Sequence, residues 1–343
     1  MKILCDQHHS DLAWSLMLLA KRLGATIYFP YGMEWYDRGY FKMYGDLRRK
    51  DPYEYLARQY LVDIFYNYDG KTATGRETYG GCLDYPTFNL LTLDQAKQTD
   101  IDIVICSLHE NEPYFAKLKE FYPKAKFVRQ VGNQLDMNID DNLYPNLLAS
   151  ANEPYEAFKK NKVLYRQEFD MNLFKTRPVI NFNHLYTFQN GIEEDERAWR
   201  TWIDLKHLLP DFVFKAYGVG NDSGRIYSKR EYIEAMLNSA FIFQQKFADG
   251  FSHIVHNALA LGRIMVLNED VYSENICAPL LQDMETCLFI EDTSQKTAEK
   301  IKQFSTIKEI TRISQNAKNR FKDVVSFDRE FDEKIKPFFG NLI

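Results

Sequence analysis

Short apolar runs alternate with amphipathic stretches along most of the chain, a pattern typical of strands that alternate with helices. The first apolar run is Lys2–Cys5. Apolar residues at helical spacing follow in Leu12–Leu23, and a second apolar run follows in Ala25–Phe29. These three segments predict a strand, a helix and a parallel strand, the opening unit of a doubly wound domain. The turn after the first strand lacks the GxGxxG pattern of dinucleotide-binding domains, so an NAD-dependent enzyme is not expected.

The alternation is interrupted twice. Residues 30–92 are irregular, aromatic and charged, and we interpret them as an insertion with a short helix near Tyr53–Phe65. Alternation resumes at Ile101, lapses around Phe169–Pro178 and starts again at Val179. The second lapse has the character of a linker between two domains.

The pattern therefore predicts an α/β protein with two Rossmann-like, doubly wound domains of similar size. We place the first domain at residues 1–172 and the second at residues 178–326. A last helix is expected in residues 327–343.

Polar side chains gather at one junction between a strand and a helix in the second domain. Phe241–Gln244 is the strand, Asp249–Ser252 is the turn, and apolar residues at helical spacing run to Leu261 before a further strand, Ile264–Leu267. The first turn of such a helix has unpaired N–H groups, which suit phosphate or sugar oxygens. Ligands of open α/β sheets bind outside the carboxyl ends of the strands, so this junction is the leading candidate for a functional site.

The junction also resembles a motif of retaining GT-B glycosyltransferases, above all glycosyltransferase family 4. That motif has an acidic residue followed by Gly-Phe-Gly and a second acidic residue eight positions after the first. This chain has Asp249-Gly250-Phe251-Ser252 and then Asn257, followed by small residues and Gly262-Arg263. Asp replaces the first Glu, Ser replaces the second Gly and Asn replaces the second Glu. A second similarity is the apolar run Phe212–Gly220, which ends in a glycine turn. The resemblance covers about residues 178–267 and is only architectural before that.

The resemblance implies GT-B architecture, in which the two domains face a central cleft and the C-terminal helix of residues 327–343 crosses back to the first domain. It also implies a retaining, metal-independent transfer of a hexosyl or pentosyl group from a nucleotide-diphosphate sugar, with no permanently bound cofactor. It implies that Asp249, with the backbone of Gly250 and Phe251, holds sugar hydroxyls and that Asn257 holds the ribose of the nucleotide. Lys246 would neutralise the departing diphosphate. The donor-binding residues expected on this basis and from their positions in the second domain are Gly250, Phe251, Ser252, His253, His256, Asn257, Gly218, Gly220, Arg225 and Lys229.

Further candidates follow strands of the first domain, on the acceptor side. His9 and His109 are candidates to orient the acceptor hydroxyl or take its proton, although a helix cap or a packed histidine explains them equally well. The other acceptor-side residues expected here are Asp6, His8, Glu110, Gln130 and Asn133. The acceptor itself is open: a glycan, a small molecule or, least favoured, a DNA base.

Composition narrows the class of protein. The 343 residues carry a net charge of −5 without a basic stripe, which disfavours nucleic acid as the main partner. The five cysteines lack CxxC spacing and HExxH is absent, so a zinc site is not expected. Asp100-Ile-Asp102 precedes its strand, at the wrong end for a metal site. No apolar run approaches the ~20 residues of a membrane span and no signal-peptide pattern begins the chain, so a cytoplasmic protein is expected.

Two other functions fit the same residues. A GT-B-fold epimerase or hydrolase of nucleotide sugars would consume the donor without an acceptor and would need His8, His109 and His253 as acid or base. A non-catalytic scaffold would bind a sugar or nucleotide without turnover, and the replacement of two Glu by Asp249 and Asn257 keeps that alternative open.

Overall fold

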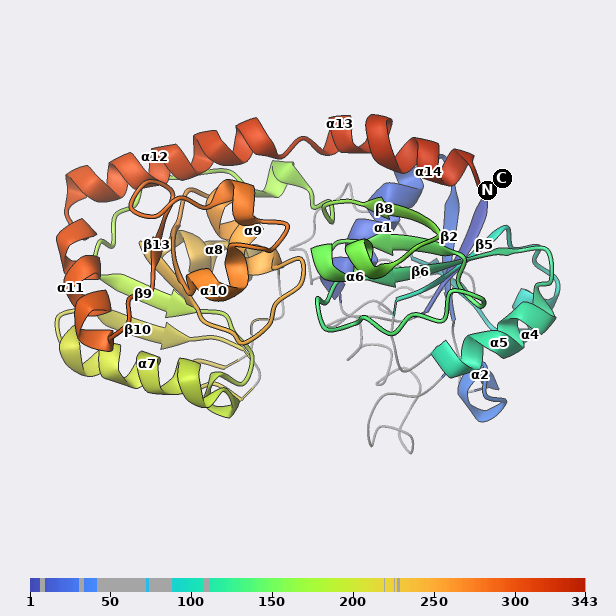
Figure 1. The fold of residues 1–343 in the computed structure, drawn as a ribbon, viewed down its shortest axis with the longest axis horizontal. Helices are drawn as coiled ribbons and strands as arrows, with labels where there is room; N and C mark the ends of the chain where they lie inside the picture. Colours follow the sequence, from blue (N-terminus) through green and yellow to red (C-terminus); the bar gives the residue numbers. More distant parts are fainter. Residues whose placement is uncertain are drawn as a thin grey trace. The chain divides into compact units, whose positions relative to one another are not determined.

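A computed structural model describes most of the chain, namely residues 1–6, 10–30, 34–41, 72–73, 88–107, 112–218, 220–224, 226 and 229–342. The chain forms two compact units, Met1–Phe169 with Phe327–Ile343 and Asp170–Ser326. Each unit has its own predominantly parallel sheet flanked by helices (Figure 1). The helix expected near Tyr53–Phe65 lies outside the described residues.

The sheet of the first unit has the strand order β3-β4-β2-β1-β5-β6-β7-β8. All described pairs are parallel except β3 with β4. β5 and β7 are buried along their whole length, as expected for parallel strands covered on both faces. The strands are β1 (Lys2–Cys5), β2 (Thr26–Pro30), β3 (Thr72–Ala73), β4 (Phe88–Leu91), β5 (Ile103–Cys106), β6 (Lys126–Val131), β7 (Asn146–Ala149) and β8 (Asn161–Leu164). β3 and β4 fall in the stretch that the sequence indicated as an insertion.

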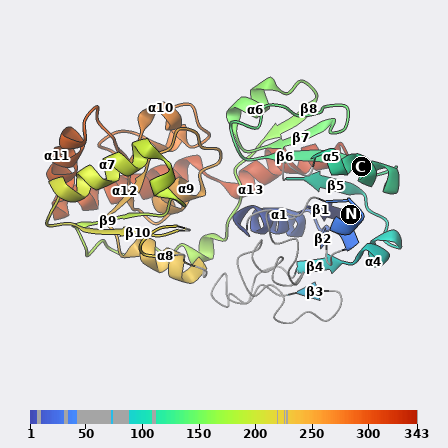
Figure 2. The ribbon, with the colours of Figure 1, turned by 90° about the horizontal axis from the view of Figure 1, so that it is seen from below.

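The C-terminal segment packs beside the first helix of this unit (Figure 2). Arg22, at the end of that helix, pairs with Glu168 and Asp328, and its guanidinium lies over the Phe331 ring. Arg166 forms a buried ion pair with Glu330. The helices of this unit are α1 (Ser10–Arg22), α2 (Glu34–Asp37), α4 (Leu93–Lys97), α5 (Glu112–Phe121), α6 (Asn152–Ala157), α13 (Phe327–Glu330), a π-helical turn (Phe331–Ile335) and α14 (Lys336–Gly340).

The sheet of the second unit has the order β10-β9-β11-β12-β13, and its strands are parallel. Its core centres on Trp202, whose ring meets Phe214 edge-on at 5.1 Å and lies 5.5 Å from Phe243. The strands are β9 (His184–Thr187), β10 (Val213–Ala216), β11 (Phe241–Gln244), β12 (Ile264–Leu267) and β13 (Cys287–Phe289). The α-helices are α7 (Glu196–Leu208), α8 (Lys229–Leu237), α9 (His253–Ala260), α10 (Glu269–Tyr272), α11 (Ser294–Phe304) and α12 (Ile307–Val324).

Side-chain caps begin several of these helices. Asp195 accepts a hydrogen bond from the Ala198 N–H at the start of α7, and Thr306 accepts one from the Glu309 N–H at the start of α12. The start of α9 is set by the backbone conformation of the residue before it. Ser252 has a left-handed backbone, with φ of 56°, which a helix cannot continue through, so α9 begins at His253. No helix in the described ranges is both long and apolar enough to cross a membrane.

Candidate active site

A hollow of about 1340 Å³ lies at the carboxyl edge of the sheet in the second unit. Its walls come from the segments that follow β9, β11, β12 and β13, together with the start of α7. Lys246 lines it from the turn after β11, and Ile254 lines it from the first turn of α9. This is the edge at which ligands bind in open parallel sheets, and the turn singled out from the sequence borders it.

Asp249 is buried behind the hollow and is tied to its neighbours. Its carboxylate accepts hydrogen bonds from Lys246 Nζ at 3.2 Å and from the Tyr272 hydroxyl at 2.7 Å. Burial by itself would raise the pKa of Asp249. The Lys246 charge and the Tyr272 hydrogen bond outweigh burial and hold that pKa below its usual value. Asp249 is therefore ionised at neutral pH and positions the Lys246 ammonium by an ion pair. Lys246 lines the hollow, whereas Asp249 does not.

The turn after Asp249 is fixed from both sides. The Asn275 side-chain amide donates hydrogen bonds to the backbone carbonyls of Asp249, at 3.1 Å, and of Gly250. The Gly250 N–H donates to the Asp249 carboxylate at 3.0 Å. Ser252 stands where the motif resembled by this chain has glycine, and it keeps the left-handed conformation that glycine adopts without strain.

Aromatic rings pack along the start of α9. Phe251 is buried and stacks on the His256 ring at a centroid distance of 4.2 Å, and it meets His253 edge-on at 4.8 Å. His256 Nδ1 lies 3.1 Å from the Ser252 carbonyl, an acceptor, so this nitrogen carries the proton. Both histidines thus contribute to the packing that holds the turn in place.

Asn257 lies deeper than its predicted role suggests. It is fully buried in α9 and does not line the hollow. Neither its amide nitrogen nor its amide oxygen has a hydrogen-bond partner in the part of the chain that the structure describes. Contact of Asn257 with a ribose therefore stays a prediction.

The glycine-rich turn after β10 closes on the segment that follows β9. The Asn221 amide donates to the carbonyls of Gln189 at 2.7 Å and Tyr217 at 2.8 Å. Gly218 is needed there, because a Cβ atom would lie 2.8 Å from the Asn190 side-chain oxygen. Neither Gly218 nor Gly220 lines the hollow.

Of the two basic residues expected beside this turn, the structure describes Lys229. Lys229 is buried, with its ammonium over the Tyr232 ring at 4.9 Å and 5.9 Å from the Phe174 ring centroid. Lys229 does not line the hollow. Arg225 lies outside the described residues.

Charged residues that the sequence analysis did not select line the hollow instead. Arg197 pairs with Asp270 at 2.8 Å. Arg200 pairs with Glu196 at 3.1 Å. Within the part of the chain that the structure describes, the lining holds seven carboxylates and three cations, namely Glu194, Asp195, Glu196, Glu269, Asp270, Glu291 and Asp292, and Arg197, Arg200 and Lys246. The acidic run Glu193–Glu196, which leads into α7, was the sequence signal that could have found this wall.

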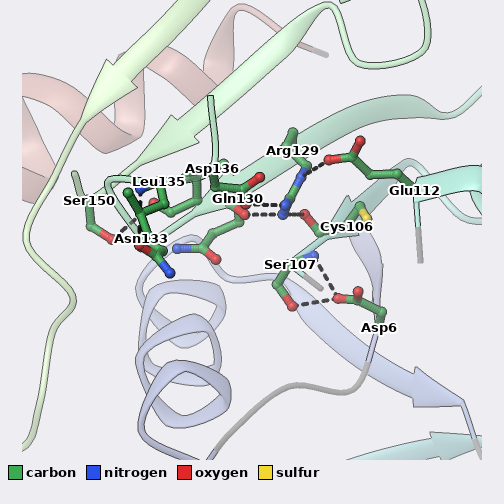
Figure 3. Close-up of polar contacts among 11 residues, drawn as sticks. Asp6, Cys106, Ser107, Glu112, Arg129, Gln130, Asn133, Leu135, Asp136 and Ser150 are labelled. Atoms are coloured by element: carbon green, nitrogen blue, oxygen red, sulfur yellow. Dashed lines mark hydrogen bonds and ion pairs between the residues drawn. The ribbon is translucent and has the colours of Figure 1, made fainter. Parts of the chain in front are cut away.

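In the first unit, the carboxyl edge of the sheet carries Asp6, Gln130 and Asn133, whose contact with an acceptor stays a prediction (Figure 3). Asp6 follows β1 and is buried. It accepts hydrogen bonds from the backbone N–H of Ser107 at 2.7 Å and from its hydroxyl at 2.5 Å. Gln130 is buried, and the Asn133 side chain accepts a hydrogen bond from the Leu135 N–H. His8, His9, His109 and Glu110 lie outside the described residues.

A buried arginine braces this edge. Arg129 forms ion pairs with Glu112 and Asp136, and it donates hydrogen bonds to the carbonyls of Cys106 and Gln130 (Figure 3). Its guanidinium ties β6 to β5, the start of α5 and the 132–140 loop. The sequence did not indicate Arg129 as a site residue, because it lies within an apolar run that predicts a strand. Within the described ranges, no group of three or more metal-ligating side chains comes together.

Comparison with known proteins identifies structures with a similar fold but no relative of similar sequence. No family model matches the sequence, and a search of curated proteins finds no match. Among solved structures, the pneumococcal O-GlcNAc transferase GtfA in complex with UDP and GlcNAc has a TM-score of 0.66 at 10% identity, covering 100% of this chain and 99% of its own. TarM gives 0.64 at 9% identity, with 99% and 98% covered. Sucrose-phosphate synthase from Thermosynechococcus elongatus gives 0.61 at 8% identity, with 100% and 99% covered.

The chain has the GT-B fold. The predicted α/β class with two Rossmann-like domains is thereby confirmed. The narrower resemblance to family 4, and the roles that it implies for individual residues, remain predictions.

Proposed function

We propose that the protein is a glycosyltransferase that moves a sugar from a nucleotide-diphosphate donor bound by the second unit. One observation carries the proposal. A hollow at the carboxyl edge of the second sheet is bordered by Lys246 and the first turn of α9, in a fold that matches solved glycosyltransferases end to end. The UDP in the GtfA complex supports a nucleotide as part of the ligand.

The described residues suit the departure of a diphosphate. Lys246, held by Asp249, and the N-terminal turn of α9 would face the negative charge that builds on the leaving group. In the retaining, metal-independent reaction that we propose, the bond between the sugar and the diphosphate breaks as the acceptor oxygen bonds to the same sugar carbon. The acceptor proton passes to an oxygen of the leaving phosphate, so no strong protein base is required.

The acceptor is proposed to meet the first unit near Asp6, Gln130 and Asn133. In that role the Asp6 carboxylate, already held by Ser107, would orient an acceptor hydroxyl rather than remove its proton. A glycan or a small molecule fits this polar edge.

Thermal unfolding against a panel of nucleoside diphosphates and their sugar conjugates tests the proposal. A ligand at 100 times its dissociation constant adds about 2.7 kcal/mol to stability, which is roughly several degrees for domains of this size. We expect one nucleotide class to raise the Tm and Lys246→Ala to remove most of that rise. Lys302→Ala, an exposed lysine on α11, is the control and should leave the rise intact. No shift with any nucleotide would contradict the proposal.

A non-catalytic binding protein is the second candidate, and two observations favour it. Asp249 is committed to Lys246 and Tyr272, and Asn257 is buried away from the hollow. Such a protein would show the nucleotide-dependent rise in Tm without consuming any nucleotide sugar.

A further inference from the structure

Two buried glutamines line the hollow, and their amide oxygens have no hydrogen-bond partner among the described residues. Gln189 is 5% exposed and Gln245 is 3% exposed, and both line the hollow. For each, the side-chain oxygen has no partner among the residues that the structure describes. A buried polar atom without a partner costs free energy, so these oxygens are positioned for donors that a ligand brings.

Strand register places the two glutamines next to each other. Thr187 of β9 pairs with Phe243 of β11 in the parallel sheet. Gln189 and Gln245 each follow two residues later, so they leave adjacent strands at the same level. Asn268 supports this row from β12, because its amide accepts a hydrogen bond from the Lys246 N–H and donates one to the Lys246 carbonyl.

The charges around the glutamines disfavour an anion at this place. Among the described residues, seven carboxylates line the hollow, and two of the three lining cations, Arg197 and Arg200, are paired with lining carboxylates. Lys246, the third cation among the described lining residues, is paired with Asp249 and lies in the turn between β11 and α9. An acidic wall with hydrogen-bond acceptors at its base suits hydroxyls and amines, and it repels carboxylates.

An exposed aromatic ring completes this part of the hollow. Phe247 lines it and is 74% exposed, directly after Lys246. Its ring offers an apolar face to the C–H side of a sugar and a negative π-face to a protonated amine.

We propose that Gln189 and Gln245 are specificity-determining residues that accept hydrogen bonds from hydroxyl or amine groups of the transferred sugar. The hollow accordingly selects a neutral or amine-bearing sugar over one that carries a carboxylate. This inference rests on the proposed function, since it assigns the sugar-binding part of the same donor site.

Calorimetric titration of the full chain tests the sugar selectivity separately from the proposed binding of a nucleotide sugar. The ligands are the nucleoside diphosphate that binds best and its conjugates with glucosamine, glucose and glucuronic acid. We expect the glucuronic acid conjugate to bind about tenfold more weakly than the glucose conjugate, and the glucosamine conjugate to bind at least as tightly as the glucose conjugate. Equal binding of the glucuronic acid conjugate would overturn the inference while leaving the proposed function in place.

The variants Gln189→Met and Gln245→Met remove the acceptors while keeping a similar side-chain volume. Each should weaken the glucose and glucosamine conjugates about three- to tenfold and leave the nucleoside diphosphate alone unchanged. Gln315→Met, on the exposed side of α12, is the matched control. Weaker binding of the nucleoside diphosphate itself in the Gln189 or Gln245 variant would place the phosphate or base there and overturn the inference.

If no nucleoside diphosphate binds, the proposed function fails, and the hollow is then tested with free sugars. Glucosamine and glucuronate are titrated by NMR against the native chain and both variants. Glucosamine shifts that disappear in the variants would support the acceptor pair, whereas their absence from the native chain would overturn it.

Discussion

At the scale of single residues, the site depends on a turn that would be strained without its supports. Ser252 is a non-glycine residue with a left-handed backbone, which costs an L-residue about 1–2 kcal/mol. The turn keeps this conformation because Asn275 donates hydrogen bonds to the Asp249 and Gly250 carbonyls and because Phe251 stacks on His256. The sequence places Ser252 in a motif position, but its conformation depends on Asn275, which lies 23 residues further along the chain.

Substitutions at position 252 test this strain. Ser252→Gly should leave the free energy of unfolding equal or higher, because glycine adopts this φ without a Cβ clash. Ser252→Val should lower it by about 1–2 kcal/mol, because a β-branched side chain suffers most there. Chemical denaturation measures both. A valine variant as stable as the glycine variant would show that the left-handed conformation is not imposed on this residue.

The ion pair of Asp249 with Lys246 makes the stability of the folded protein depend on pH in the acid range. Its pKa is lowered in the folded protein, so its contribution to stability is present above the unfolded value of about 3.9. The contribution is lost as the pH falls from there through the lower folded pKa. The Tm of Asp249→Asn should therefore lie well below that of the native chain at pH 7, and the gap should narrow below about pH 3.9. A gap of constant size across pH 2–7 would contradict this account.

At the scale of elements, the C-terminal helices belong to the first unit although they follow the second in sequence. The periodicity of α13 and α14 predicts a helix, and α/β alternation predicts the sheets. Neither pattern predicts the contact between Glu330 and Arg166. The Glu330 carboxylate accepts a hydrogen bond from the Arg166 backbone N–H at 2.8 Å and pairs with the Arg166 guanidinium. Contacts between residues 164 positions apart follow from tertiary packing alone.

Two acidic residues of α13 provide a matched comparison. Glu330→Ala should lower the free energy of unfolding of the first unit by about 3 kcal/mol, because it leaves the buried Arg166 charge without its partner. Asp328→Ala should cost less than about 1 kcal/mol, because that carboxylate is 84% exposed. Urea denaturation of both variants decides the matter. Equal costs would mean that burial of the Arg166 pair does not anchor the helix.

At the scale of the whole molecule, the fold is more predictable than the site. Apolar runs such as Ile264–Leu267 are fully buried strands, as their letters indicate, and the chain has the fold of glycosyltransferases with which it shares 8–10% identity. The hollow could not be predicted in the same way, since its wall combines short polar segments after four strands and the start of α7. Gln189 and Gln245 are brought together by the register of β9 with β11, which the sequence does not reveal.

The most direct test of the central claim is product analysis by mass spectrometry after incubation with nucleotide sugars and a panel of glycan and small-molecule acceptors. The account predicts a glycosylated acceptor and free nucleoside diphosphate in equal amounts, with both lost in Lys246→Ala and retained in Lys302→Ala. Donor consumed without any acceptor would indicate an epimerase or hydrolase. Donor bound but unchanged across the whole panel would contradict transfer and leave a binding protein.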